Sequence, residues 1–249
     1  MNSSFPCLFW RPNMSSSLHQ TDRDSTAIFR RMRPRGNELD SHHYTRILAL
    51  HMGCSSSGAT TEIGRDAMNA LSDLVGSGSC SLLSLDVSGT DADGWDLIQA
   101  LKTDSGLTSL DVRRIPHMHD LYETLASTLL DEKTGLDKEA SRRIRFLRCD
   151  DFEILEGVQT LSLKDSPLEP SALKLLLAVL KHNSTLTELD LTAANVKADI
   201  VPTFCEVLQH NATLTTLRLA YNPSLDETAR AALTAAVGSR EPSLVLHFE

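Results

Sequence analysis

The sequence predicts an α/β solenoid, with a curved parallel sheet on its concave side and helices on its convex side. Two observations predict it. A short leucine pattern recurs at a nearly constant interval over most of the chain, and a stretch with helical spacing follows each good copy. One strand–turn–helix unit cannot bury both of its faces alone, so neighbouring units must stack to close a common core.

The strands are predicted from the pattern Leu-x-x-Leu-x-Leu. Alternate side chains of a strand point to opposite faces, so the leucines face inward and the residues between them face outward. Weaker copies at 47–50 and 244–248 are expected to be degenerate ends. The five good copies begin at Leu82, Leu107, Val158, Leu186 and Leu214.

The helices are predicted from apolar residues that recur every three or four positions. Each predicted helix follows a strand and returns along the outside of the sheet, where its apolar side covers the leucines. The predicted ranges are 63–75, 95–101, 121–130, 172–180, 200–208 and 228–237.

Two consecutive segments carry a family resemblance. "LTELDLTAANV" at 186–196 and "LTTLRLAYNPSL" at 214–225 follow one another in phase. They resemble leucine-rich repeats of the ribonuclease-inhibitor-like class, and the resemblance covers about 46–249. It implies a leucine-rich-repeat solenoid with units of about 28 residues, and a turn asparagine that bonds backbone groups of its own turn and of a neighbouring repeat. Only Asn222 occupies that place.

The chain divides by composition and period. Residues 1–40 are rich in Ser, Pro and Arg and lack apolar periodicity, which predicts a disordered basic leader or, alternatively, a targeting segment. Residues 41–249 form the predicted repeat domain. Because the interval from Leu110 to Leu161 is nearly twice the usual one, an irregular interruption is expected at 131–157, with a strand near 144–149.

Charge and cysteine content limit the partners. Residues 1–36 carry a charge of 6 − 2 = +4, so the rest of the chain carries 18 − 31 = −13. An acidic body argues against a nucleic acid as the main ligand. Five scattered cysteines without a CxxC pair indicate reduced thiols, so a cytoplasmic location is expected, or an organelle matrix if 1–40 is a transit peptide. The longest apolar run, 173–180, is far short of the roughly 20 residues that span a bilayer.

Histidine and cysteine residues offer weak candidates for chemistry. His182-Asn183 and His210-Asn211 are one repeat interval apart, at the expected end of successive helices. There the histidine favours the helix dipole and the asparagine is expected to adopt a left-handed cap. Cys205 is expected in the core.

A second group, His117, His119 and Asp120, matches no zinc spacing and is expected in a solvated loop. The sequence therefore predicts no catalytic residue, no metal and no cofactor, and a protein that is not an enzyme.

The outward residues of the strands predict a polar, mildly acidic binding face on the concave side. The row that follows each strand, including Ser88, Thr192 and Ala220, is also expected to be exposed. The expected partner is another protein with a basic segment. The residues predicted to bind it are Asp86, Asp111, Arg113, Lys164, Glu188, Asp190 and Arg218.

These observations predict a non-catalytic scaffold or adaptor for protein–protein interaction. Two alternatives stay open: a structural subunit of a larger cytoskeletal, ciliary or organellar assembly, and a repeat protein that regulates a GTPase. The sequence indicates neither the oligomeric state nor the partner's identity.

Overall fold

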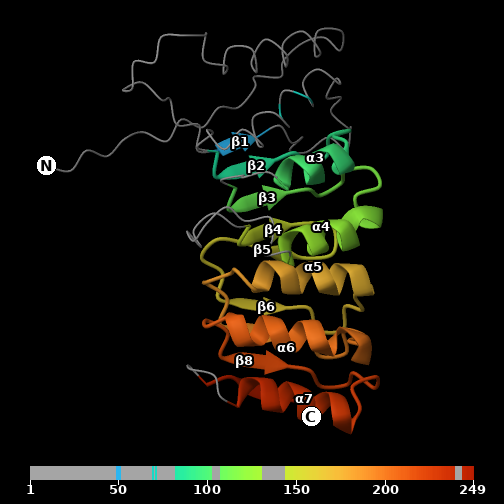
Figure 1. Cartoon of the computed structure of the whole chain (residues 1–249), viewed down its shortest axis with the longest axis vertical. Coiled ribbons are helices and arrows are strands. Elements are labelled where there is room, and N and C mark those ends of the chain that lie inside the picture. The colour runs from blue at the N-terminus through green and yellow to red at the C-terminus, as the bar shows by residue number, and fades with distance from the viewer. Residues whose placement is uncertain are drawn as a thin grey trace, which may run out of the picture. The chain divides into compact units, whose positions relative to one another are not determined.

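The computed structural model describes residues 49–51, 69, 71, 82–102, 107–130, 144–238 and 243–249. The chain divides into two compact units, and Figure 1 labels their helices and strands where there is room. Unit 1 comprises Met1–Met118 with Lys133–Arg143, and unit 2 comprises His119–Glu132 with Ile144–Glu249. The leader 1–40 and most of the predicted helix 63–75 lie outside the described residues.

Unit 1 contains three parallel strands and helix α3. Strands β1 (Ala49–His51), β2 (Ser84–Asp86) and β3 (Ser109–Asp111) pair in register, so that Leu50, Leu85 and Leu110 are aligned. Leu85 and Leu110 are buried. Helix α3 (Gly94–Leu101) connects β2 to β3 and begins at Asp93, whose carboxylate accepts hydrogen bonds from the first-turn amides.

Unit 2 contains a sheet of four parallel strands in the order β6-β7-β8-β9. The strands pair in register, which aligns Leu161, Leu189, Leu217 and Leu246 at a nearly constant interval of sequence. The strands are β6 (Thr160–Ser162), β7 (Glu188–Asp190), β8 (Thr216–Arg218) and β9 (Val245–His247).

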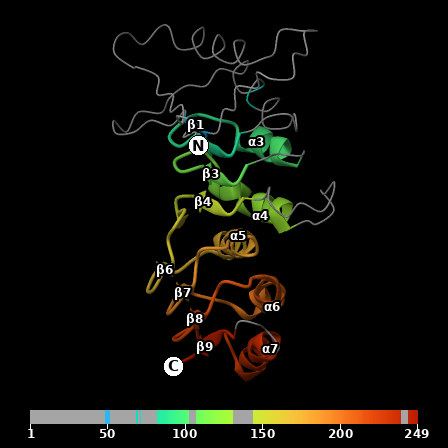
Figure 2. The ribbon, with the colours of Figure 1, turned by 90° about the vertical axis from the view of Figure 1, so that its left-hand side faces the viewer.

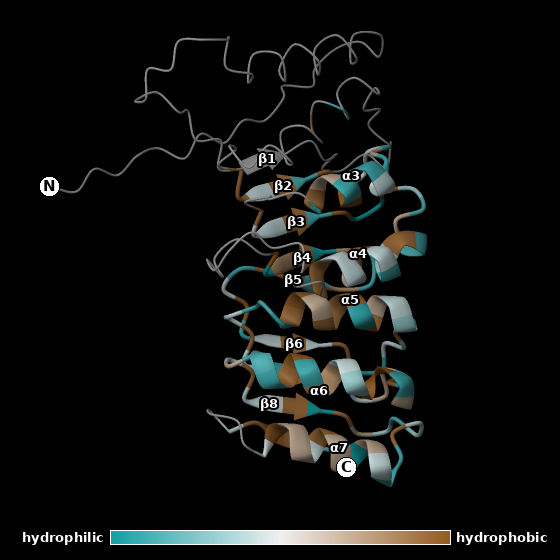
Figure 3. Cartoon of the chain, viewed as in Figure 1, coloured by the Kyte–Doolittle hydropathy of each residue, from teal (hydrophilic) through white to brown (hydrophobic). Residues whose placement is uncertain are grey.

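One helix connects each pair of these strands, and all three lie on the same side of the sheet (Figure 2). They are α5 (Pro170–Leu180), α6 (Val201–His210), which follows the 3-10 turn η3 (Ala198–Ile200), and α7 (Glu227–Val237). Central α5 is apolar around most of its circumference because it is covered on several sides (Figure 3). The two-layer α/β arrangement predicted from the sequence is present in this unit.

Unit 2 begins with a departure from this pattern. The 3-10 turn η1 (His119–Leu121) leads into α4 (Tyr122–Leu130), and β4 (Phe146–Arg148) then forms an antiparallel hairpin with β5 (Glu153–Ile154). No helix separates β4 from β6, and α4 packs directly against α5. The strand expected near 144–149 is confirmed as β4, and the described part of the interruption is this hairpin.

The turn after each leucine strand repeats one backbone conformation. The fourth residue after the aligned leucine is left-handed, with φ between 54° and 64°. Gly89 adopts it freely because it has no Cβ. The other four residues at this place do so against their intrinsic preference, at about 1–2 kcal/mol each. They are Arg114, Asp165, Ala193 and Tyr221.

Buried asparagines bond consecutive turns to one another. The Asn211 amide donates to the Leu180 and Asn183 carbonyls (2.7 and 3.1 Å), and its oxygen accepts from the Thr213 and Leu214 amides (3.0 and 2.9 Å). The predicted left-handed caps are wrong, because Asn211 has φ −80° and Asn183 is not among the positive-φ residues. Asn183 likewise donates its side-chain amide to a backbone carbonyl inside the fold, that of Arg145, 2.9 Å away.

Asn222 behaves as the resemblance implies. Its amide donates to carbonyls of its own turn and to the Leu191 carbonyl of the preceding strand–helix repeat (2.8 Å). Its oxygen accepts from the Val196 amide (2.8 Å). All three asparagines are buried, so each satisfies backbone groups that have no access to water.

We predict that Asn211→Ala lowers the free energy of unfolding by about 2–4 kcal/mol, because it leaves several buried backbone groups without partners. Gln209→Ala, an exposed change two residues away, should shift it by no more than about 0.5 kcal/mol. Urea unfolding followed by circular dichroism measures both. Equal effects would show that the Asn211 bonds contribute nothing.

Candidate binding surface

The side of the unit 2 sheet that faces away from the helices carries a polar surface. Two predicted residues from neighbouring strands form an ion pair there: Glu188 and Arg218 approach to 4.0 Å, with side chains 47% and 44% exposed. Lys164 is exposed and Asp190 is half-buried. Thr160 and Ser162 of β6 complete this surface, which we call the strand face of unit 2; it consists of Thr160, Ser162, Lys164, Glu188, Asp190 and Arg218.

The row expected to be exposed beyond the strands is largely buried. Ser88, Thr192 and Ala220 were predicted on the surface, and this is wrong for all three. Directly after them the chain enters the left-handed turn and crosses toward the helix layer, so these side chains are enclosed. The accessible width of the face is therefore smaller than strict alternation predicts.

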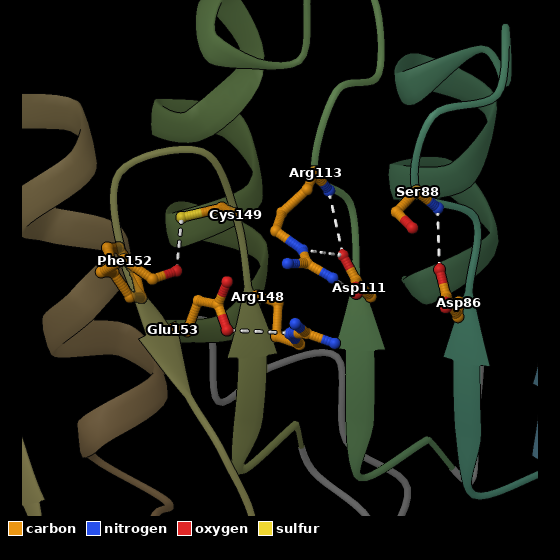
Figure 4. Close-up of polar contacts among 8 residues, drawn as sticks. All are labelled: Asp86, Ser88, Asp111, Arg113, Arg148, Cys149, Phe152 and Glu153. Atoms are coloured by element: carbon orange, nitrogen blue, oxygen red, sulfur yellow. Dashed lines mark hydrogen bonds and ion pairs between the residues drawn. The ribbon is translucent and has the colours of Figure 1, made fainter. Parts of the chain in front are cut away.

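Asp111 is a structural residue of unit 1, contrary to the expectation that it is exposed. Its side chain is 7% exposed and binds Arg113 through two contacts, Nε to Oδ1 at 3.0 Å and Nη2 to Oδ2 at 2.7 Å (Figure 4). Asp111 lies beside Asp86 of the neighbouring strand, and the Arg113 guanidinium offsets the repulsion between the two carboxylates.

Three of the predicted aspartates share a local role. Asp86, Asp111 and Asp190 each accept a hydrogen bond from the backbone amide two residues ahead, at 2.9, 3.2 and 2.9 Å. This arrangement is an Asx turn, and here it begins the chain's exit from the strand. The acidic residues at these positions are therefore partly explained by turn formation.

The hairpin of unit 2 adds a pair that the sequence did not indicate. Arg148 of β4 donates from Nε to Glu153 of β5 at 3.1 Å, and both side chains are about one-third exposed (Figure 4). Sequence reasoning missed it because β5 has two residues and no leucine pattern. The pairing depends on the tight turn at 149–152.

One exposed aromatic residue was also missed. Tyr221 is 80% exposed and occupies the left-handed position after β8. A bulky residue is strained at such a backbone conformation, and a side chain this exposed buries little surface that could offset the strain. The sequence could have indicated this, because the leucine pattern aligns Tyr221 with Gly89 at the same turn position.

The histidine candidates do not assemble a catalytic site. His210 donates from Nδ1 to the Glu206 carbonyl (2.8 Å), one helical turn earlier, as a residue at a helix end can do. His119 lies on the surface, with Nε2 3.9 Å from a carboxylate oxygen of Asp151. Among the described residues, no group of three or more His, Cys, Asp or Glu could hold a metal ion.

The two cysteines among the described residues, Cys149 and Cys205, are free thiols. Burial raises the pKa of the Cys149 thiol to about 11, and Cys149 donates weakly to the Phe152 carbonyl. Burial likewise raises the pKa of its neighbour Tyr122. Cys205 was expected in the core but is half-buried, and burial raises its pKa as well. A nucleophile needs the thiolate, which such surroundings disfavour.

Comparison with known proteins adds no assignment: no protein-family model matches the sequence, and no curated protein matches it. Within the part of the chain that the structure describes, no helix has the length and apolar character needed to cross a membrane.

We predict that Cys149 resists alkylation by iodoacetamide at pH 8, where a pKa of about 11 leaves about one thiol in a thousand ionised. Half-buried Cys205 is the internal control and should react faster. Mass spectrometry of the digested protein measures both rates, and unfolding in urea should abolish the difference. Equal rates in the native protein would contradict the burial of Cys149.

We predict that Asp111→Ala lowers the free energy of unfolding by about 2–3 kcal/mol, because it removes both the Arg113 pair and the Asx turn. Asp111→Asn keeps the turn acceptor and should cost about 1 kcal/mol less. Asp190→Ala, which removes the same turn acceptor at a half-buried site, is the matched control. If Asp111→Ala and Asp190→Ala cost the same, the Arg113 pair is not stabilising.

Proposed function

We propose that this protein is a non-catalytic scaffold for protein–protein interaction, built as a solenoid of leucine-rich repeats of the ribonuclease-inhibitor-like class. The observation that carries the proposal is the in-register stacking of the four parallel strands of unit 2, with helices on one side only. A sheet covered on one face presents the other as a rigid array of side chains. Such an array suits recognition of another protein.

The strand face of unit 2 is the proposed docking surface. It carries two cations, Lys164 and Arg218, and two carboxylates, Glu188 and Asp190, among small hydroxyl side chains. This mixture favours a partner segment with charges of both signs. The basic partner segment expected from the sequence depended in part on Asp111, whose carboxylate is bound by Arg113.

The absence of catalysis is part of the proposal, and the roles of the candidate residues support it. The amides of Asn183 and Asn211 hydrogen-bond to backbone carbonyls inside the fold. Burial disfavours the thiolate of Cys149. The positions of these three residues are thus accounted for by structural roles.

A cytoplasmic location is also proposed. Asn183 and Asn211 begin two Asn-X-Thr sequences that a secretory pathway could glycosylate, but a glycan attaches to the same side-chain nitrogen that here donates inside the fold. The folded chain could not carry sugars there. This use of the two residues fits a compartment without N-glycosylation.

A charge swap tests the docking surface. We predict that Glu188→Lys combined with Arg218→Glu abolishes capture of the main binding partner while leaving the melting temperature unchanged, because the 4.0 Å pair is kept with its polarity reversed. Quantitative pull-down from native lysate identifies the partner. Calorimetry with the purified partner should then show at least about a tenfold loss of affinity.

The control places the same two charges on the helix side. Gln209→Lys with Ala198→Glu changes exposed residues of α6 and of η3 and should leave binding intact. Retention of the partner by the swap variant would show that the strand face is not the docking surface. Loss of the partner by the control variant as well would point to a general defect.

A further inference from the structure

Strand β9 is the last strand of the unit 2 sheet and has an open edge. The Val245 amide donates to the Thr215 carbonyl (2.9 Å), and the His247 carbonyl accepts from the Leu219 amide (2.7 Å). Backbone groups of alternate residues point to opposite edges of a strand, so the amide and carbonyl of Leu246 point to the other edge. No described residue pairs with β9 there.

Apolar side chains are exposed around this edge. Val245 is 52% exposed, and Leu246 and Phe248 are half-buried. The aligned residues Leu189 and Leu217 are fully buried, because the next strand and helix of unit 2 cover each of them. The core therefore reaches the surface at β9.

Helix α7, which covers β9, has an exposed side of small uncharged residues. These are Thr228, Ala231, Ala232, Thr234 and Ala235, beside Glu227. Exposed positions of α6 carry larger polar groups, including Glu206, Gln209 and His210, and α7 is correspondingly pale to brown over most of its length (Figure 3). The exposed side of α7 is therefore less polar than that of α6.

We propose that this end of unit 2, formed by β9 and α7, docks on the same end of a second copy of the chain. The two β9 strands would pair antiparallel about a two-fold axis perpendicular to the sheet at Leu246. Such an axis keeps both α7 helices on one side of the joined sheet, so their small exposed residues meet and allow close approach of the helix axes, at about 8 Å.

Charge and register favour a second copy. In this pairing Val245 lies opposite His247 of the second copy, Leu246 opposite its own equivalent, and Glu249 opposite Ser243. No residue faces a like charge across the new strand pair. The same axis leaves both strand faces open on one side of the dimer, so the docking is compatible with the proposed partner binding and does not depend on it.

Charge complementation tests this contact with the full chain. The wild type is expected to sediment as a dimer at about 100 μM, whereas Ala232→Glu/Ala235→Glu and Ala232→Lys/Ala235→Lys should each be monomers. An equimolar mixture of the two variants should again form a dimer containing one chain of each. Gln209→Glu on α6 is the control and should leave the dimer intact.

Several outcomes would overturn the proposal. A wild type that is monomeric at about 100 μM lacks the contact. If the mixture stays monomeric while circular dichroism shows both variants folded, the α7 face does not meet its own copy. If either variant forms a dimer by itself, the interface does not include the α7 face. Val245→Lys, which leaves α7 unchanged, must also weaken the dimer, or β9 takes no part.

Discussion

The alignment of leucines in parallel register is the constraint on which the rest of unit 2 depends. Leu189 lies between its equivalents in β6 and β8 and is excluded from water. Full burial of one such side chain contributes about 1.5–3 kcal/mol. Holding that register fixes where each strand ends, and therefore where the turn must satisfy its backbone groups. The buried Asn211 and Asn222 amides reach carbonyls about one repeat away, which is possible only if the register holds.

The periodic part of the fold could be predicted from the sequence. Predicted strands and helices coincide with β2, β3, β6 to β9 and α3 to α7 within a few residues, because leucine spacing reports burial directly. The turns could not be predicted as well. Asn211 was expected to cap its helix locally, but its amide donates to carbonyls of the preceding repeat, at Leu180 and Asn183. The residue type at one position does not indicate which distant carbonyls its side chain will reach.

The candidate surface was predicted in outline and altered in detail. Strand alternation placed Glu188 and Arg218 on the open side of the sheet, where they lie. It could not show that Asp111 turns its carboxylate to Arg113, because that pair depends on side-chain geometry two residues apart. The strict alternation rule also failed at Thr192, where the chain had already left the strand. Sequence reasoning is therefore dependable within the strands and weak where they end.

The interruption explains why the unit 2 sheet has two unlike edges. With no helix between β4 and β6, α4 packs directly on α5, and Lys174 pairs with Glu123 between them. The strand layer then holds β4, β5 and β6 over two helices, and the parallel sheet begins afresh at β6. At the β6 end Leu161 is half-buried between exposed Thr160 and Ser162. At the β9 end Leu246 is half-buried in the same way, but its neighbour Val245 is an exposed apolar residue, so the two ends differ in the side chains beside the leucine.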